Sequence, residues 1–452
     1  MIDTLSTGSI AGASAAAQAA PDAPDIVPVL PRQARTVRDT GLEPRFLSDL
    51  LLKAIQAGGK APLAVLAGKL RLSVSVLREV LNPLIAEQLV EVAWCGDSDI
   101  DMQYHLTPAG QRAALDALAR CRYLGPAPVT LAAYRAVVER QALRHPDTER
   151  VTPAQLATVL GDDGLAPAAR AVLGAALHAR RSLLLYGPSG SGKTVLAKKL
   201  ARLLPGPIAV PYALMAGRQV IRLYDPVLHQ PAGAPARQQE DRRSCDARWV
   251  LCQRPLVHVG AELGRDTLDL RHDPEEGVYH APPHLLANNG MLVLDDVGRQ
   301  RIPAAELLNR FIAPLDAGAD QLTLQGGQAE TLPFDAAVVF ATNLAPASVL
   351  DDAALRRIGY KVEIGALGAA AYRALLRRQC RARRIEYDET VAGHLVERLH
   401  PRSGRALLAC YPAELVERIA DFAGFAGTAP GLTTAAVEQA WRSMFIADGM
   451  EA

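Results

Sequence analysis

The sequence lacks an excess of charge of either sign, because 49 Lys and Arg residues stand against 48 Asp and Glu residues in a chain of 452. The net charge of +1 gives no reason to expect nucleic acid or an anionic membrane as a partner held by bulk electrostatics. Long apolar runs are also missing, since none approaches the ~18 residues that a membrane-spanning helix needs. We therefore expect no membrane insertion.

Cysteine is scarce too, and the closest two of the six, Cys245 and Cys252, are too far apart for a CxxC pair. Scattered cysteines of this kind indicate reduced thiols in a cytoplasmic protein. No Lys or Arg precedes Arg32, so the N-terminus lacks the basic segment of a signal peptide. These absences together predict a cytoplasmic localisation.

Changes in composition and periodicity divide the chain into five segments. These are an Ala/Ser/Pro-rich disordered arm over residues 1–41, a small domain over 42–121, a connector with one short helix over 122–153, an α/β domain over 154–365 and a purely helical domain over 366–452. Apolar residues make up 49% of the chain, which is enough to give each of the three domains a core.

The domain over 42–121 resembles a winged helix, with helix, helix-turn-helix and a two-stranded wing. Ser73 or Ser75 can cap its second long helix, and LVEVA and QYHLT read as the wing strands. Residues 44–112 contain seven basic and seven acidic residues, and the wing tip GDSDID is acidic. Because DNA affinity depends on neutralising phosphates, we favour docking to protein, with DNA reading as the alternative.

The stretch GPSGSGKT matches the phosphate-binding pattern G-x-x-x-x-G-K-[ST] between a strand-like and a helix-like segment. Glycines let backbone N–H groups converge on phosphate oxygens, and the following helix presents its positive end. In such a loop Lys193 reaches the β and γ phosphates, and the Thr194 hydroxyl binds Mg²⁺. The predicted nucleotide-binding residues are Gly187, Pro188, Ser189, Gly190, Ser191, Gly192, Lys193 and Thr194.

Two acids end the apolar strand in GMLVLDDVGRQ, about a hundred residues further on. Asp295 is placed to hold Mg²⁺ through water, and Asp296 to activate an attacking water. A strand end with two solvated acids is the alternative, and the phosphate loop makes it the weaker one.

Two later elements supply an amide and two arginines. Asn343 follows the strand in DAAVVFATN, where its amide can orient water or contact the γ-phosphate, although Asn is also common in turns. Arg356 and Arg357 end a short helix before the strand at Tyr360. One of them could reach a neighbouring subunit's site, or it could simply cap its own helix.

These four elements in this order, followed by helices, resemble the AAA+ ATPase superfamily over about residues 156–446. The resemblance implies a five-stranded parallel sheet with helices on both faces, a helical lid, ATP and Mg²⁺ as ligands, and assembly into a ring. Carried over to this chain, Lys193 and Thr194 form Walker A, and Asp295 and Asp296 form Walker B. Asn343 corresponds to sensor 1, and Arg357 corresponds to the arginine finger better than Arg356.

Two stretches resemble the MoxR, magnesium-chelatase and sigma-54-activator branch. They are YHAPPHLLANNGMLVLDD and a predicted hairpin, Gln321–Leu324 with Thr331–Phe334, turning at Gly326-Gly327. The whole chain is similar to bacterial predicted ATPases with an N-terminal winged helix. Two departures are the Asp296 in place of the usual Glu, and Ala413 where sensor 2 usually has an arginine, for which Arg402 or Arg405 could substitute.

Three weaker patterns remain. The stretch WVLCQRPLVHVG, residues 249–260, reads as a β-hairpin at the end of an insertion that could contact substrate. The arginine-rich stretch over 372–384 reads as a solvated helix in preference to an anion-binding patch. The histidines of one region fit no zinc spacing and are expected to be ordinary surface or core residues: His258, His272, His280 and His284.

The sequence therefore predicts an ATP-hydrolysing AAA+ protein that forms a hexameric ring and remodels an unidentified protein client. The alternative is a nucleotide-switched regulator that binds DNA through the winged helix. A small-molecule kinase is a weak third possibility, because no acceptor site is evident.

Overall fold

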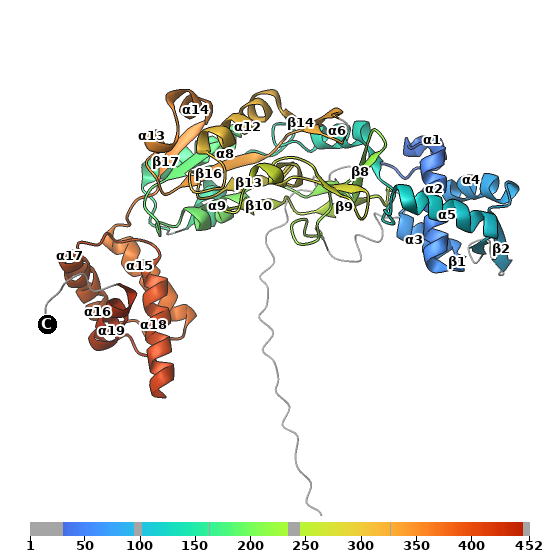
Figure 1. Ribbon diagram of the computed structural model, residues 1–452. Coiled ribbons are helices and arrows are strands. Elements are labelled where there is room, and N and C mark those ends of the chain that lie inside the picture. Colours follow the sequence, from blue (N-terminus) through green and yellow to red (C-terminus); the bar gives the residue numbers. More distant parts are fainter. Residues whose placement is uncertain (1–29, 95–101, 162, 234–244, 326, 446–452) are drawn as a thin grey trace, which may run out of the picture.

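The computed structural model describes residues 30–94, 102–161, 163–233, 245–325 and 327–445 (Figure 1). A helical N-terminal domain, a central α/β part and a C-terminal helical domain follow one another along an elongated molecule (Figure 1). No helix in these ranges has the length and apolar character to cross a membrane.

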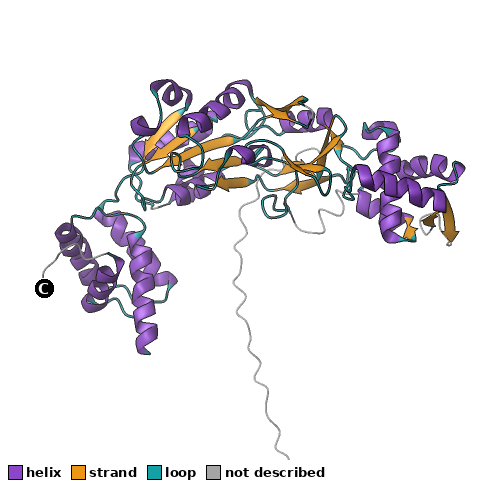
Figure 2. Ribbon diagram, viewed as in Figure 1, coloured by secondary structure: helices purple, strands orange, loops and turns teal. Residues whose placement is uncertain are grey.

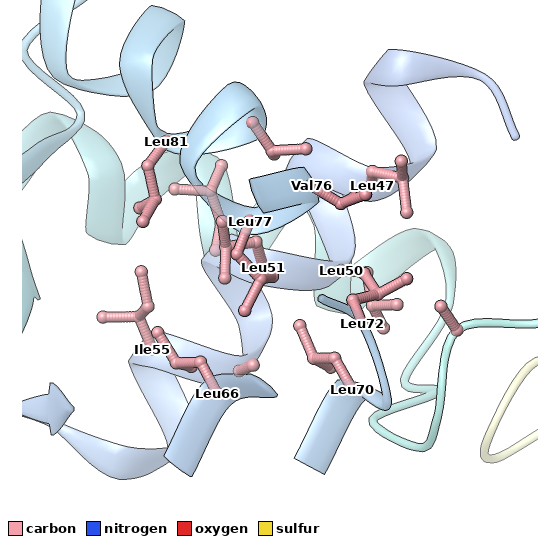
Figure 3. Close-up of a cluster of buried hydrophobic side chains, with 14 of the residues drawn as sticks. Leu47, Leu50, Leu51, Ile55, Leu66, Leu70, Leu72, Val76, Leu77 and Leu81 are labelled. Carbon is pink, nitrogen blue, oxygen red and sulfur yellow. The ribbon is translucent and has the colours of Figure 1, made fainter. Parts of the chain in front are cut away.

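The N-terminal domain packs its helices around a leucine-rich core (Figure 3). It also carries a small antiparallel sheet of order β1-β3-β2. Ser73 and Thr107 accept hydrogen bonds from backbone N–H groups at the starts of α4 and α5, as helix-capping side chains do. Its elements are α1 (Val37–Thr40), α2 (Pro44–Gly58), β1 (Ala61–Pro62), α3 (Leu63–Leu70), α4 (Val74–Ala86), β2 (Val90–Trp94), β3 (Gln103–Leu106) and α5 (Pro108–Arg120). The wing tip lies outside the described residues.

The expectation of a disordered arm up to residue 41 is wrong for its last part. Thr36 and Asp39 form a reciprocal capping box at the start of α1. Val37 is buried in the leucine core, and Ser73 Oγ donates a hydrogen bond of 2.7 Å to the Ala34 carbonyl. Local caps and a few apolar contacts therefore order residues that composition alone assigned to the arm, and residues 1–29 lie outside the described ranges.

The predicted connector belongs to the central part. Its strand β4 (Val129–Thr130) is the last strand in a second sheet of order β11-β12-β8-β7-β4. The helices α6 (Leu131–Arg140) and α7 (Pro153–Leu160) follow. The other strands of this sheet are β7 (Ala213–Ala216), β8 (Gln219–Arg222), β11 (Arg271–Asp273) and β12 (Val278–His280).

The main sheet has five parallel strands in the order β10-β13-β16-β5-β17. The strands are β5 (Leu183–Tyr186), β10 (Leu256–Val259), β13 (Met291–Leu294), β16 (Ala337–Thr342) and β17 (Tyr360–Glu363). Alternate side chains pack against α12 (Ala304–Ala317) and α14 (Asp352–Arg357) on one face, and against α8 (Pro167–Ala179) and α9 (Lys193–Ala201) on the other. Helices on both faces explain why these strands are apolar nearly throughout (Figure 2).

One predicted hairpin is wrong and another is confirmed. Strand β9 (Trp249–Cys252) pairs antiparallel with β6 (Ile208–Pro211), whereas β10 pairs in parallel with β13, so residues 249–260 form no hairpin. Strands β14 (Ala319–Thr323) and β15 (Ala329–Pro333) pair antiparallel as expected. Gly326 of their turn is outside the described residues.

The C-terminal domain is helical throughout its described residues (Figure 2). Its elements are α15 (Ala369–Ala382), α16 (Glu389–His394), a π-helical turn (Leu395–Leu399), α17 (His400–Ser403), α18 (Tyr411–Ala426) and α19 (Thr434–Met444). The short helices α11 (Pro283–Leu286) and α13 (Pro346–Val349) and a 3₁₀ turn (Arg265–Thr267) complete the central part.

The N-terminal domain is joined to the second sheet by a shared core. Ala213, Val220 and Val278 of β7, β8 and β12 are buried in the same cluster as the leucines of α2 and α4. At the edge of this joint Arg248 forms a buried ion pair of 2.7 Å with Asp246, with side-chain exposures of only 5% and 7%. The same guanidinium donates to two backbone carbonyls, those of Thr40 and Pro128.

Replacing Arg248 by Ala would leave the Asp246 carboxylate buried without a counter-charge. Removing one partner of a buried ion pair typically costs about 3–5 kcal/mol. We therefore expect R248A to lower the denaturant midpoint for unfolding of the N-terminal domain and to speed amide hydrogen exchange in residues 37–42.

The matched control is Arg265→Ala, which removes an exposed ion pair with Glu306. It should leave both the midpoint and the exchange unchanged. Equal behaviour of R248A and R265A would show that the buried pair does not hold the joint.

Candidate nucleotide-binding site

A cavity of about 600 Å³ lies between the carboxyl ends of the main-sheet strands and the C-terminal helical domain. The carboxyl edge of a parallel sheet is where ligands bind in open α/β folds. The predicted site residues that line it are Ser189, Gly190, Ser191, Gly192, Lys193, Thr194, Asp295, Asp296 and Asn343. Three predicted residues do not line it, namely Gly187, Pro188 and Arg357.

The loop between β5 and α9 needs glycine for its shape. Gly187, Gly190 and Gly192 have φ angles of 136°, 81° and 94°, a region that residues with a Cβ rarely adopt. A Cβ on Gly187 would lie 2.3 Å from the carbonyl oxygen of Ile364 at the end of β17. The loop is therefore a cradle shaped by glycine at the start of a helix, as an anion requires.

Lys193 folds back over this loop. Its Nζ donates to the carbonyl oxygens of Gly187 and Pro188 at 2.9 and 2.8 Å. Burial lowers the pKa of Lys193, while the nearby carboxylates of Asp295 and Asp296 act in the opposite direction. The ammonium group of Lys193 thus already lies at the loop. Its N–H groups, which now donate to carbonyl oxygens, could donate to phosphate oxygens instead.

The Asp295 carboxylate connects the loop to the sheet. One oxygen, Oδ2, accepts hydrogen bonds from Thr194 Oγ1 at 2.5 Å and from His258 Nε2 at 3.1 Å, and Oδ1 accepts from the Asp296 N–H at 2.9 Å. Burial alone would raise the pKa of Asp295, but these hydrogen bonds bring it below its usual value.

Thr194 and Asp295 offer the oxygen ligands that Mg²⁺ prefers. Among the described residues no group of three or more His, Cys, Asp or Glu side chains gathers as a metal site. Mg²⁺ usually binds through one or two protein oxygens together with waters and substrate phosphates. The pair therefore fits a magnesium ion that arrives with a nucleotide.

Asp296 and Asn343 lie beside this pair at the ends of adjacent strands. Asn343 Nδ2 donates to Asp296 Oδ1 at 2.8 Å. Asp296 has a φ of 53°, which Asp tolerates better than most residues because its short side chain bonds locally. The turn at Asp296 presents its carboxylate to the cavity, which both residues line.

Arg357 is exposed on the last turn of α14, and Arg356 beside it is exposed as well. Neither has an ion-pair partner within the described part of the chain. Both guanidinium groups are thus available to a second molecule, and neither lines the cavity of its own chain.

The C-terminal domain reaches the cavity through α15 and α18. Ala413 lines the cavity near the start of α18. Arg405 lies 3.6 Å from the ring centroid of Phe445, so it does not replace the missing sensor-2 arginine, and Arg402 is exposed and does not line the cavity. Among the described residues of this domain the cation that lines the cavity is Arg378, which sequence reasoning did not single out.

Sequence reasoning also missed His258. The sequence shows it as one of four histidines in a region, and the structure gives each a separate partner. His258 contacts Asp295, while His272 contacts Gln325, His280 lies 3.6 Å from Asp273, and His284 contacts Asp320. The available signal was its place in an apolar strand that precedes the strand of Asp295.

Strand order, loop and acids agree on one architecture, and residues 156–213 match the family model of magnesium chelatase, subunit ChlI. This segment contains the end of α7 and all of α8, β5, the phosphate loop, α9 and β6. The central part of the chain is a P-loop α/β fold with a five-stranded parallel sheet and helices on both faces, and this segment of it is similar to the magnesium-chelatase subunit. Residues 368–443 match a domain of unknown function (DUF8689), which covers most of the helical domain.

Solved structures resemble the chain only distantly. NtrX from Brucella abortus in complex with ATP shares 14% identity at a TM-score of 0.38, over 74% of this chain and 64% of that one. The RuvB Holliday junction branch migration motor of Thermotoga maritima shares 14% identity at a TM-score of 0.35, over 61% and 68%. The chain thus spans less than two thirds of NtrX. No curated protein matches it significantly.

The contact between Gly190 and the helical domain provides a test of the cavity. A Cβ on Gly190 would lie 2.5 Å from Cys410 Sγ, and the Cys410 N–H donates to the Gly190 carbonyl at 3.0 Å. We expect Gly190→Ala to weaken binding of a fluorescent ATP analogue at least about tenfold, because a misplacement of about 1 Å in a site has effects of this size.

Gly427→Ala is the control, since it has a similar φ of 68° but open space around its Cβ position. It should cost some stability and leave nucleotide affinity unchanged. Adding Cys410→Ala to Gly190→Ala should restore part of the affinity. If G190A and G427A bind the analogue equally, the cavity is not the nucleotide site.

Proposed function

We propose that the chain is an ATPase that assembles into a ring and uses ATP hydrolysis to remodel a protein client. The observation that supports this is the arrangement in one cavity of a phosphate loop, a Thr194–Asp295 hydrogen bond and an Asp296–Asn343 hydrogen bond. A protein that only binds a nucleotide would need the phosphate loop alone. The Asp296–Asn343 pair matches the groups that a hydrolytic site places near the γ-phosphate.

Each residue has a role in this proposal. The backbone N–H groups of residues 187–194 cradle the phosphates, and Lys193 neutralises their charge. Thr194 and Asp295 would hold Mg²⁺, which when bound neutralises further charge on the phosphate oxygens. Asp296 accepts the proton of the attacking water, and Asn343 positions that water.

The short acid at position 296 is compatible with this role. An Asp in place of Glu withdraws the carboxylate by about an ångström, a displacement that can cost ~100-fold in rate. The hydrogen bond from Asn343 fixes the Asp296 carboxylate, and the turn at Asp296 sets its direction. We expect slow hydrolysis with an intact binding site.

The ring is proposed because, among the described residues, the arginine that lines the cavity is Arg378 of the helical domain, whereas the predicted arginine finger does not line it. Arg357 is exposed and does not line the cavity of its own chain. An arginine supplied by a neighbouring subunit stabilises the charge that develops on the transferred phosphoryl group. We propose a hexamer, with Arg357 acting in the adjacent subunit.

We interpret the N-terminal domain as a winged helix that docks a protein client. The element order α2-β1-α3-α4-β2-β3 supports the winged-helix assignment. On α4 the exposed side chains include Glu79 and Ile85, and its one basic residue, Arg78, is partly buried. A helix with this surface offers little to DNA phosphates, so no observation favours the DNA-regulator alternative. The cytoplasm stays our predicted localisation.

Steady-state ATP hydrolysis measured against protein concentration tests this proposal. We expect specific activity to rise with concentration, because each site is completed by a neighbour. Asp296→Ala and Arg357→Ala should each lose at least about 100-fold in kcat while still binding ATP. Arg384→Ala, an exposed arginine of the helical domain, is the control and should keep full activity.

Two results would contradict the proposal. Activity that does not change with concentration and is indifferent to Arg357 would exclude the ring and the arginine finger. Salt-sensitive DNA binding lost on substitution of α4 would favour the regulator instead.

A further inference from the structure

His258 is a side chain at this site to which the proposed function gives no role. It lies in β10, the strand next to β13, and its register partner is Val293. Side chains two positions apart on a strand share a face, so Asp295 follows Val293 on the face that His258 also occupies. That face is the one covered by α9, whose second residue is Thr194. Strand register thus brings Thr194, Asp295 and His258 together.

The hydrogen bond from His258 to Asp295 has a defined direction. An ionised carboxylate can only accept, so His258 Nε2 carries the proton at 3.1 Å from Asp295 Oδ2. The side chain of His258 is 35% exposed and that of Asp295 is 12% exposed. His258 does not line the cavity, so it contacts the carboxylate of Asp295 on the side away from the cavity.

The same carboxylate oxygen also accepts from the Thr194 hydroxyl. The Thr194 hydroxyl could hold a magnesium ion through an oxygen lone pair and still donate its proton to Oδ2. Oδ2 therefore has two donors from the protein, Thr194 and His258, and Oδ1 has the Asp296 N–H. Of these three donors, His258 is the one that comes from a different strand and lies outside the cavity lining, so the orientation of the carboxylate depends on it in addition to the groups at the site itself.

We propose that His258 is a positioning residue for the magnesium-associated carboxylate of Asp295. This inference rests on the proposed ATPase function. Partners behind a metal ligand fix its orientation, and their loss typically costs 10- to 100-fold in metal affinity or activity. His258 sets how tightly the site holds Mg²⁺, and it leaves the binding of the nucleotide itself to the loop.

The test compares two substitutions at His258 with the same two at a matched histidine. His280 lies in strand β12, is also 35% exposed and also faces a carboxylate, that of Asp273. Phe at either position removes the donor and keeps a ring, whereas Gln keeps an N–H near the place of Nε2. The full-length chain is used, and circular dichroism confirms folding of each variant.

The first measurement is the Mg²⁺ concentration that gives half-maximal ATP hydrolysis. We expect His258→Phe to raise it about 10- to 100-fold, His258→Gln to recover most of the loss, and both His280 variants to match the wild type. The KM for ATP at saturating Mg²⁺ should change little. Equal Mg²⁺ dependence of the Phe variants at 258 and 280 would overturn the proposal.

The second measurement separates this inference from the proposed function. Affinity for a fluorescent ATP analogue is measured with Mg²⁺ and with EDTA. We expect His258→Phe to lose the gain in affinity that Mg²⁺ provides and to keep the wild-type affinity in EDTA. A wild type that binds with this Mg²⁺ gain but hydrolyses nothing would sink the ATPase proposal alone, whereas an unchanged Mg²⁺ gain in His258→Phe would sink the role of His258.

Discussion

The parallel pairing of β13 with its two neighbours is the constraint on which the site depends. Met291 to Leu294 pair residue by residue with β10 on one side and β16 on the other. Because facing alternates along a strand, a shift of one residue would turn Asp295 into the opposite face. The register therefore determines the site. It brings an amide, two acids and a histidine together at the carboxyl ends of β16, β13 and β10. The phosphate loop, which follows β5, begins at the same end of the sheet.

At the amino ends of the same strands, a partly buried polar network supports this register. Arg254 donates to the carbonyls of Pro205, Asn289 and Gln141, and burial lowers its pKa to about 10. Asn289 adopts a φ of 60° and donates to Asp335 at 2.8 Å. These bonds join the starts of β10, β13 and β16 to the residue after α6. A shift of register would separate these hydrogen-bond partners, so the network favours the observed pairing of the strands.

Elements with a strong local signal could be predicted, and those decided by distant contacts could not. The phosphate loop, the strand of Asp295 and the β14–β15 hairpin follow from residue type and spacing. Strand β9 pairs with β6 instead of β10, and β6 lies about forty residues earlier in the chain, so local sequence does not indicate this pairing. The helical conformation of residues 37–40 depends on the capping box of Thr36 and Asp39, which lies at the end of a segment whose composition predicts disorder. His258 joins the site across a strand pair, which spacing along the chain does not show.

The shared core between the N-terminal domain and the second sheet has a mechanical consequence. Ala213, Val220 and Val278 bury themselves among the leucines of α2 and α4, and Arg248 bonds across the joint. The N-terminal domain is thus packed directly against the α/β part and not joined to it by the chain alone. Because the two parts share a core, a rotation of the second sheet would carry the N-terminal domain with it. The far end of that domain would then move by a distance that grows with its distance from the joint.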